Sequence, residues 1–160
     1  MENEAAFRTD EDFMRIALRQ AARAAAEEEV PVGAVAVDDS GAIIGRAANQ
    51  VEKLSDGTAH AEMIALTQAS AAVGDWRLNA VTLYVTKEPC PMCAGAMINC
   101  RLGRLVFGCP DPHRGGAGSA LNLLDFPGLP HKVDFSGGVL AEECLALIQG
   151  FFQFRRQQNK

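Results

Sequence analysis

One histidine, one carboxylate and two cysteines have the types and spacing of a catalytic metal site. His60 and Glu62 lie two residues apart, and Cys90 and Cys93 follow as a Cys-x-x-Cys pair. Zinc prefers tetrahedral coordination by imidazole nitrogen and thiolate sulfur, and a catalytic zinc keeps one position open for water. Three ligands are present, without a convincing fourth. We therefore expect one catalytic zinc ion per chain, bound by His60, Cys90 and Cys93.

Glu62 is the expected catalytic residue of this site. A water bound to zinc loses its proton near neutral pH, and a carboxylate beside the metal can carry that proton to the reacting group. Two residues beyond His60, at the start of a helix, Glu62 lies near the metal but points elsewhere. The sequence therefore predicts that Glu62 acts as a proton carrier and does not bind the metal.

Both ligand-bearing stretches are expected to begin a helix. Pro91 suits the first turn, where its missing N–H costs nothing. Residues i and i+3 share a helix face, so Cys90 and Cys93 can meet one ion, and the positive end of the helix dipole favours thiolates. Residues 60–73 also have the pattern of a helix. The simplest arrangement has two helix N-termini converging on one zinc.

Each part of the pattern also has a simpler interpretation. A lone Cys-x-x-Cys pair can be a redox pair, a lone histidine before a helix is usually a cap or a satisfied polar group, and a structural zinc wants a fourth ligand. A redox pair leaves His60 and Glu62 unexplained. The joint pattern therefore favours catalytic zinc. His113 is a candidate for a further ligand.

The properties of the whole chain are those of an ordinary soluble protein. The 160 residues suit one domain, over 1–160 with a core of about 9–156. No apolar run is long enough to span a membrane, and the acidic N-terminus lacks the apolar segment of a signal peptide. We therefore expect a cytoplasmic protein without a membrane partner. Three cysteines are expected to be buried free thiols: Cys100, Cys109 and Cys144.

The net charge of −5 does not demand a nucleic-acid partner. The charge is unevenly distributed, which weakens the argument against an RNA partner: residues 1–29 hold eight of the acids, and the last ten residues hold three basic residues and no acid. Arg15, Arg19 and Arg23 form a row on one side of a predicted helix. Such a row is more often a solvated face than an RNA contact.

Hydrophobic patterning predicts helices alternating with strands. A capping box at Thr9–Asp12 starts a helix to about Glu27, and the apolar run 30–37 suits a strand buried on both faces. Irregular structure is expected at 50–59 and 122–130. A strand at 42–48 is expected to form a hairpin with the first strand, and further strands are expected at 81–86, 104–108 and 132–135. A helix is expected from the cysteine pair to about residue 100. The last expected helix spans 142–156, with Leu145, Ile148 and Phe152 toward the core.

Three further features have both a structural and a functional interpretation. Asn49 can pair with a nucleobase through its donor and its acceptor, or simply form a turn. Gly33 suits either tight packing or room for a ligand. The Gly-rich segment 111–119 is predicted to be a flexible loop, which is either plain surface or a substrate-facing loop with Asp111 and Arg114 as contacts.

The pattern His-x-Glu followed by Pro-Cys-x-x-Cys resembles the signature of the zinc-dependent nucleobase deaminases. Over about residues 10–156 the chain is similar, more narrowly, to the bacterial tRNA-specific adenosine deaminases. The segments that carry this resemblance are Pro31–Val35, Thr58–Glu62, Thr82–Thr86, Glu88–Ala96, Arg104–Gly108, Gly118–Ser119, and Phe151–Phe152 with Arg155–Arg156.

This resemblance implies a cytidine deaminase-like fold: a three-layer α/β/α sandwich in which helices cover both faces of a five-stranded mixed sheet. It implies a homodimer that uses one Zn²⁺ per chain to convert adenosine to inosine at the wobble position of a tRNA anticodon stem-loop, that of an arginine tRNA. It also implies substrate contacts by Asn49 at the base, by Ala61 through its backbone, and by Asp111, Phe152 and Arg155 near the flanking nucleotides.

The chain departs from the family pattern at three places. Gly57 stands where proline is common, Lys87 where an apolar residue is more frequent, and the segment 109–114 is unusual. Two other functions remain open. One is deamination of free guanine or cytosine, because guanine deaminases share the zinc motif and much of the flanking pattern. The other is a noncatalytic zinc-binding partner subunit, which would not need a proton carrier such as Glu62.

Overall fold

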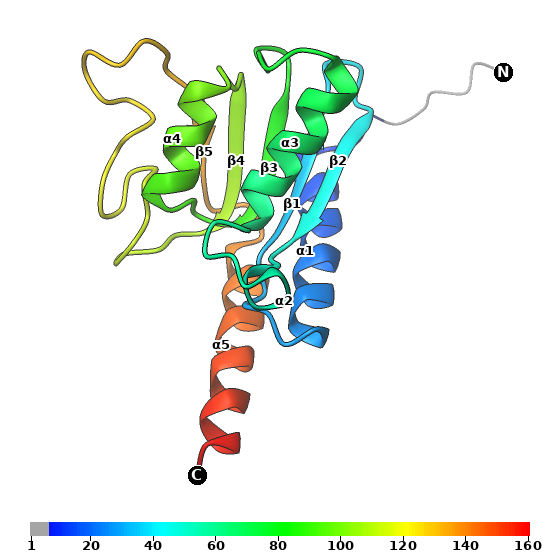
Figure 1. The fold of residues 1–160 in the computed structure, drawn as a ribbon, viewed down its shortest axis with the longest axis vertical. Coiled ribbons are helices and arrows are strands. Elements are labelled where there is room, and N and C mark those ends of the chain that lie inside the picture. The colour runs from blue at the N-terminus through cyan, green and yellow to red at the C-terminus, as the bar shows by residue number, and fades with distance from the viewer. Residues whose placement is uncertain (1–6) are drawn as a thin grey trace, which may run out of the picture.

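A five-stranded mixed sheet forms the centre of the protein, whose computed structural model describes residues 7–160 (Figure 1). The acidic segment 1–6 lies outside the described residues. The strand order is β2-β1-β3-β4-β5. β1 pairs antiparallel with both β2 and β3, whereas β3–β4 and β4–β5 are parallel pairs. The strands are β1 (Gly33–Val37), β2 (Ile43–Ala48), β3 (Thr82–Lys87), β4 (Arg104–Cys109) and β5 (Asp134–Ser136).

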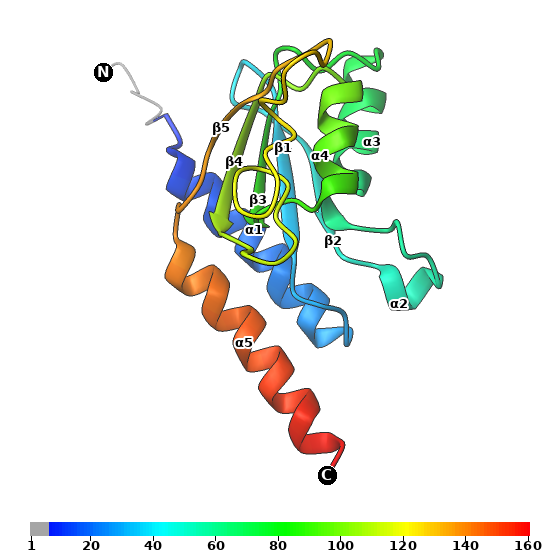
Figure 2. The same ribbon diagram turned by 90° about the vertical axis from the view of Figure 1, so that its left-hand side faces the viewer.

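Helices cover both faces of this sheet, which confirms the predicted three-layer arrangement (Figure 2). One face carries α1 (Asp10–Ala26) and α5 (Ala141–Gln158), and the other carries α3 (Ala61–Val73) and α4 (Pro91–Asn99). A short helix, α2 (Val51–Leu54), lies between β2 and α3. The C-terminal half of α5 extends beyond the sheet (Figure 1).

Alternating side chains of the strands fill two separate cores. Val35, Tyr84 and Val106 pack on the side of α1 and α5, whereas Leu83 and Leu105 pack on the side of α3 and α4. Successive residues of a strand point to opposite faces. The predicted burial of the first strand on both faces is therefore confirmed, because all five residues of β1 are buried.

Gly33 lets α1 approach the sheet closely. A Cβ atom at this position would lie 2.1 Å from the Ala17 carbonyl oxygen and 2.5 Å from the Ala21 nitrogen, both in the backbone of α1. No side chain fits at such distances, so the tight-packing interpretation of this glycine holds. Gly33 is not among the residues that line the open space beside His60 and Cys90.

A polar cluster fixes the start of α1 to the sheet. The predicted capping box is present, with the Asp12 N–H donating to Thr9 Oγ1 at 3.2 Å and the Thr9 N–H donating to Asp12 Oδ2 at 2.8 Å. One residue into the helix, Asp10 accepts hydrogen bonds from the Tyr84 hydroxyl and from both terminal nitrogens of Arg104. The Arg104 guanidinium holds the pKa of the Asp10 carboxyl below its usual value. This cluster links α1, β3 and β4.

Two local predictions differ from the structure. Residues 50–59 were expected to be irregular, but α2 forms there because the buried Glu29 carboxylate accepts the N–H of Glu52 at 2.5 Å. The last strand spans Asp134–Ser136 and not 132–135, since its pairing partners in β4 are Arg104–Val106. Both differences depend on tertiary contacts that a local pattern does not contain.

The predicted core-facing side of α5 is confirmed at Ile148 and is wrong at Leu145 and Phe152. Cys144 and Ile148 are its buried residues, whereas Leu145 and Phe152 are exposed. A Cβ atom at Gly108 of β4 would lie only 2.4 Å from Cys144 Sγ, so the thiol occupies the space that this glycine leaves open. That contact sets the rotation of the helix, and Ile148 follows one turn later.

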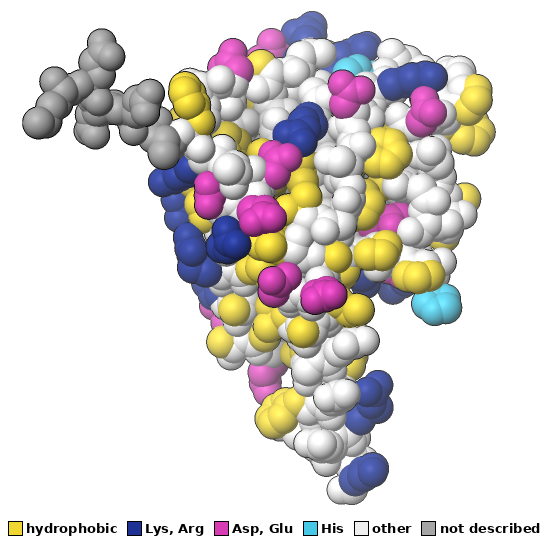
Figure 3. Space-filling view, turned by 180° about the vertical axis from the view of Figure 1, so that it is seen from behind, with side chains coloured by type: hydrophobic (Ala, Val, Ile, Leu, Met, Phe, Trp, Pro, Cys, Tyr) yellow, Lys and Arg dark blue, Asp and Glu magenta, His cyan; other side chains and the backbone are white. Residues whose placement is uncertain are grey.

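The arginine row on α1 is a solvated face. Arg15 pairs with Glu11 at 3.4 Å, and Arg23 pairs with the C-cap residue Glu27 at 3.8 Å, and all four side chains are exposed. Figure 3 shows basic and acidic side chains interspersed on the face that α1 and α5 form, with further basic groups at the end of α5. Within residues 7–160, no helix has the length and apolarity to cross a membrane.

Candidate metal centre and substrate pocket

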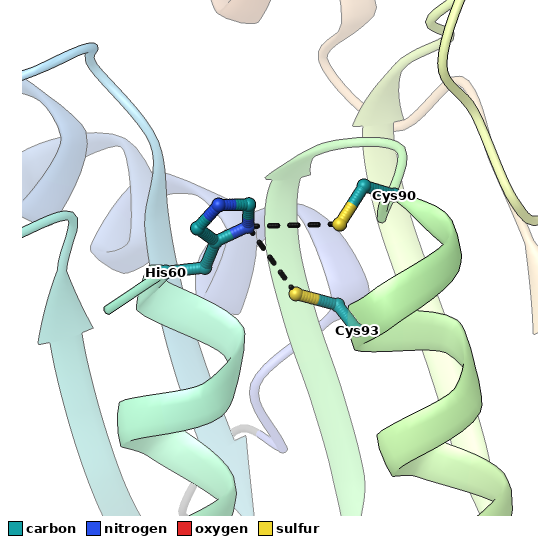
Figure 4. A group of neighbouring side chains, drawn as sticks. All are labelled: His60, Cys90 and Cys93. Carbon is teal, nitrogen blue, oxygen red and sulfur yellow. Dashed lines mark hydrogen bonds between the residues drawn. The ribbon is translucent and has the colours of Figure 1, made fainter. Parts of the chain in front are cut away.

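The metal-ligand candidates lie at two neighbouring helix N-termini (Figure 4). His60 is the N-cap residue of α3, and Cys90 is the N-cap residue of α4. Pro91 takes the first helical position, as the sequence predicted, and places Cys93 one turn along on the same side as Cys90. β3 leads directly into this turn, so the end of a central strand fixes the position of both sulfurs.

The three donor atoms have the spacing of a tetrahedral zinc site. His60 Nδ1 lies 3.4 Å from Cys93 Sγ and 3.7 Å from Cys90 Sγ. In a tetrahedron with typical Zn–N and Zn–S bonds, the nitrogen and sulfur ligands are about 3.6 Å apart. Among the described residues, the group that could hold a metal consists of these three, and it does not include His113. The donor set and its geometry therefore fit zinc.

The two cysteines are electrostatically unequal. A hydrogen bond from the Cys93 thiol, with a further contribution from His60, lowers the pKa of Cys90 to about 3. The same contact with Cys90, together with burial, raises the pKa of Cys93. The contact with Cys90 also raises the pKa of His60. The cluster thus retains negative charge on sulfur at neutral pH, as a cation site requires.

Glu62 lies within the first turn of α3 and is almost completely buried. Burial is the largest effect on this carboxyl and raises its pKa, despite contacts with its own backbone N–H and with the Cys93 thiol. A carboxyl group with a raised pKa holds a proton more readily than a free carboxyl group does, as a group that carries a proton from one atom to another must. The environment of Glu62 therefore suits proton transfer.

A pocket of about 480 Å³ opens beside the metal-ligand group. His60, Cys90 and Glu62 form its inner wall, and Asn49 lies beside them. Asn49 is buried, and its Oδ1 accepts the backbone N–H of Ala61 at 3.0 Å. The two residues expected at the base are thus hydrogen-bonded to each other. Gly57 also lines the pocket. The other charged residues around it are Glu28, Glu29, Glu52, Lys87, Glu88, Asp111, Arg114 and Arg155.

Glu88 organises the loop that closes one side of the pocket, a role that the sequence analysis missed. Its carboxylate accepts the N–H groups of Asp111, Ala117 and Ser119 and the Ser119 hydroxyl. Residues 115–117 are buried, in contrast to the flexible loop that was predicted. Most of its partners are backbone groups that lie at least 23 residues away in the chain, so no local signal in the sequence indicates this role.

Of the four remaining expected contacts, three line the pocket. Asp111 and Arg114 line it, and Arg155 lines it from α5. Arg155 donates to the Glu28 carbonyl at 2.8 Å and lies over the Phe151 ring at 4.9 Å. Phe152 is exposed on α5 and is not part of the pocket wall. The geometry therefore brings three of these four residues to the pocket.

Comparison with known proteins places this geometry in a family. The profile of the cytidine and deoxycytidylate deaminase zinc-binding region matches residues 7–109. A tRNA-specific adenosine deaminase of Haemophilus influenzae is 48% identical over 94% of this chain and 87% of its own length. A structure from a study of A-to-I editing by tRNA:A34 deaminases at the wobble position is 40% identical over 84% of this chain and 97% of that chain, with a TM-score of 0.81.

A guanine deaminase from Nitrosomonas europaea has a TM-score of 0.77, covering 89% of this chain and 84% of that chain. Its identity is 24%, so this likeness shows the shared fold alone. The much higher identity to the Haemophilus protein extends over nearly the whole length of both sequences. The chain belongs to the zinc-binding cytidine and deoxycytidylate deaminase family, and within it to the tRNA-specific adenosine deaminases.

Proposed function

We propose that this protein is a zinc-dependent hydrolase that converts adenosine to inosine at the wobble position of a tRNA anticodon. The observation that carries the proposal is the convergence of one imidazole and two sulfurs beside a buried glutamate in a pocket. This donor set leaves one coordination position for water. High identity to tRNA-specific adenosine deaminases supports the choice of substrate.

In this proposal His60, Cys90 and Cys93 bind a single zinc ion. When bound, zinc lowers the pKa of a water enough for hydroxide to form near neutral pH. Glu62 takes one proton of the attacking water and delivers it to N1 of adenine. It then takes the proton of the new C6 hydroxyl group and passes it to the amino group at N6, which leaves as ammonia as the C6 carbonyl forms. Its raised pKa supports this role, because the group must hold the proton between the two transfers.

Asn49 and Ala61 form the proposed base-reading part of the pocket. The Asn49 Oδ1 is occupied by the Ala61 N–H, and this hydrogen bond fixes the orientation of the side chain. The Asn49 amide nitrogen is therefore the group available to donate to a ring nitrogen of the base. The target base has to leave its stack to enter the pocket, and an anticodon loop makes this inexpensive because the base is unpaired.

The flanking nucleotides are expected to contact the mouth of the pocket. Asp111 and Arg155 line this mouth, and Phe152 offers an exposed ring on the adjoining helix. Aromatic rings stack on splayed RNA bases, and arginine pairs with phosphate. We assign these three residues to the anticodon nucleotides on either side of the adenosine.

A homodimer is the proposed assembly. α3 and α4 carry apolar side chains that pack against the core and remain partly exposed, among them Met63, Ile64 and Met92. α4 is apolar almost all round, since Asn99 is its only polar residue. A helix that is apolar on all sides is normally covered, and a second copy of the chain would cover α4. Sedimentation analysis should give twice the mass of one chain, and a monomer at micromolar concentration would contradict the dimer.

The five cysteines are all free, which supports a reducing compartment such as the cytoplasm.

A substrate panel tests the proposed reaction. The zinc-loaded protein is incubated with an anticodon stem-loop that carries adenosine at the wobble position, and separately with free adenine, guanine and cytosine. Inosine should form in the stem-loop, and the free bases should react poorly because they lack the flanking nucleotides that supply binding energy. Rapid turnover of guanine without inosine in the stem-loop would assign the protein to the free-base deaminases. No ammonia from any substrate would favour the noncatalytic zinc-binding subunit.

A further inference from the structure

Lys87 places a positive charge at the mouth of the pocket. The residue ends β3, directly before Glu88, and its Nζ lies 3.0 Å from Asp111 Oδ2. The side chains of Lys87 and Asp111 are 29% and 12% exposed. Both residues line the pocket. This ion pair is therefore partly shielded from water, yet the ammonium group can still be reached by a ligand.

Asp111 is held so that it can orient this lysine. Its Oδ1 accepts the N–H groups of His113 and Arg114, each at 3.1 Å, and its own N–H donates to Glu88 Oε1 at 3.2 Å. The carboxylate is thereby fixed, and Oδ2 is the oxygen that faces Lys87. An ammonium group has three N–H donors. One is directed at Asp111, which leaves two for a ligand.

The charge of the pocket makes this lysine important. Six carboxylates and three cations line it. Glu29, Glu62 and Glu88 are buried within its wall, whereas Glu28 and Glu52 are exposed. A polyanion approaching such a surface needs fixed positive groups close to its phosphates. Of the three cations, Arg155 is already hydrogen-bonded to the Glu28 carbonyl, so Lys87 and Arg114 are the main candidates.

We propose that Lys87 binds a backbone phosphate of the RNA beside the target nucleotide, and that Asp111 is its positioning residue. The inference rests on the proposed function, because it requires an RNA substrate. Asp111, assigned above to a flanking nucleotide, then also acts on the RNA through Lys87. The competing account is that Lys87 only cancels the charge of Asp111 and touches no ligand. The two accounts predict different behaviour for the same variants.

The first test measures how salt affects binding. Affinity for a fluorescent anticodon stem-loop is measured between 50 and 200 mM salt (about the range over which phosphate contacts weaken), using zinc-loaded protein in a Glu62→Gln background so that the substrate is not consumed. Lys87→Met should weaken binding about tenfold and reduce the log–log salt slope by about 0.7, the contribution of one phosphate on a single strand. Lys87→Arg should retain both values. An unchanged slope in Lys87→Met would overturn the proposal.

A matched control separates this contact from general charge effects. Lys132 pairs with Asp125 at 2.9 Å in an exposed loop and does not line the pocket. Lys132→Met removes the same charge from a similar lysine–aspartate pair. Its affinity and salt slope should equal those of the parent protein. An equal loss in both lysine variants would show that net charge, and not a phosphate contact at Lys87, controls binding.

The second test combines Lys87→Met with Asp111→Asn. Asparagine keeps the Oδ1 acceptor for His113 and Arg114 while it removes the negative charge. If Lys87 binds phosphate, the double variant should remain as weak as Lys87→Met. Recovery of full affinity in the double variant would establish simple charge cancellation and overturn the proposal. A failure of the proposed function is distinguished from a failure of this inference by the unmodified protein, which would then form no inosine in the stem-loop.

Discussion

Two buried glutamates of the same pocket have opposite environments. Glu62 and Glu88 are 4% and 3% exposed, and both line the pocket. Glu88 accepts four hydrogen bonds from the loop that it holds. Burial dominates the environment of Glu62 and raises its pKa. A buried carboxylate with a full set of donors maintains a structure, whereas one that burial pushes toward the neutral form is suited to carry a proton.

The largest effect is expected from removal of a proposed zinc ligand, because the proposed role of Glu62 depends on the metal. Cys93→Ala leaves two ligands where a catalytic site needs three. The variant should lose its zinc and all measurable inosine formation in the stem-loop assay. Metal content is read by elemental analysis after dialysis against metal-free buffer. Full zinc occupancy in this variant would show that Cys93 is not a ligand.

Glu62→Gln should produce the next largest effect. General acid–base catalysis contributes about 10²–10⁴-fold to rate, so the single-turnover rate should fall by about that factor. Zinc content and the melting temperature should not decrease, because the amide has the same shape and needs no charge. Loss of metal from Glu62→Gln would identify Glu62 as a ligand and remove the contrast with Glu88.

Glu88→Gln tests the other half of the comparison. The amide turns one acceptor into a donor that faces backbone N–H groups, which costs about 1–3 kcal/mol for a buried group without a partner. We expect a lower free energy of unfolding, a raised KM for the stem-loop and full zinc occupancy. Urea unfolding and steady-state kinetics measure these quantities. If stability were unchanged while kcat fell as far as in Glu62→Gln, Glu88 would take part in the chemistry.

The smallest effect concerns the polar cluster outside the pocket. Arg104 lowers the pKa of Asp10 below its usual value near 3.8. The pair therefore adds stability above that pH, and the stability is lost as the pH falls through the lowered native value. Asp10→Asn should flatten the decrease in stability on the acid side of pH 3.8, without an effect on zinc or turnover. Urea unfolding from pH 6 to pH 2 (roughly the window of acid unfolding) checks this.

The metal centre could be predicted from the sequence because its information is local. Cys90 and Cys93 share one helix turn, and His60 and Glu62 share another. The types of these residues and their spacing indicate zinc chemistry, and the positions of the two helix N-termini follow from capping rules. The first strand could be predicted for a similar reason, because a two-sided apolar run such as β1 has few alternatives.

Other features depend on contacts between distant parts of the chain. Glu88 acts through backbone N–H groups that any residue at positions 111, 117 and 119 would supply, except proline. The rotation of α5 follows from the fit of Cys144 against Gly108. The short helix α2 requires the carboxylate of Glu29, which lies 23 residues earlier. None of these contacts leaves a periodic signal in the sequence.

Titration of zinc into the metal-free protein is the most direct test of the central claim, that one metal and Glu62 together deaminate adenosine. A chelator removes the metal, and inosine formation in the stem-loop is then measured as zinc is added back to the unmodified protein and to Glu62→Gln. The rate of the unmodified protein should rise from zero and saturate at about one zinc per chain, as three ligands define one site. Glu62→Gln should bind the same amount of zinc and remain nearly inactive. Undiminished inosine formation by the metal-free protein would contradict the account.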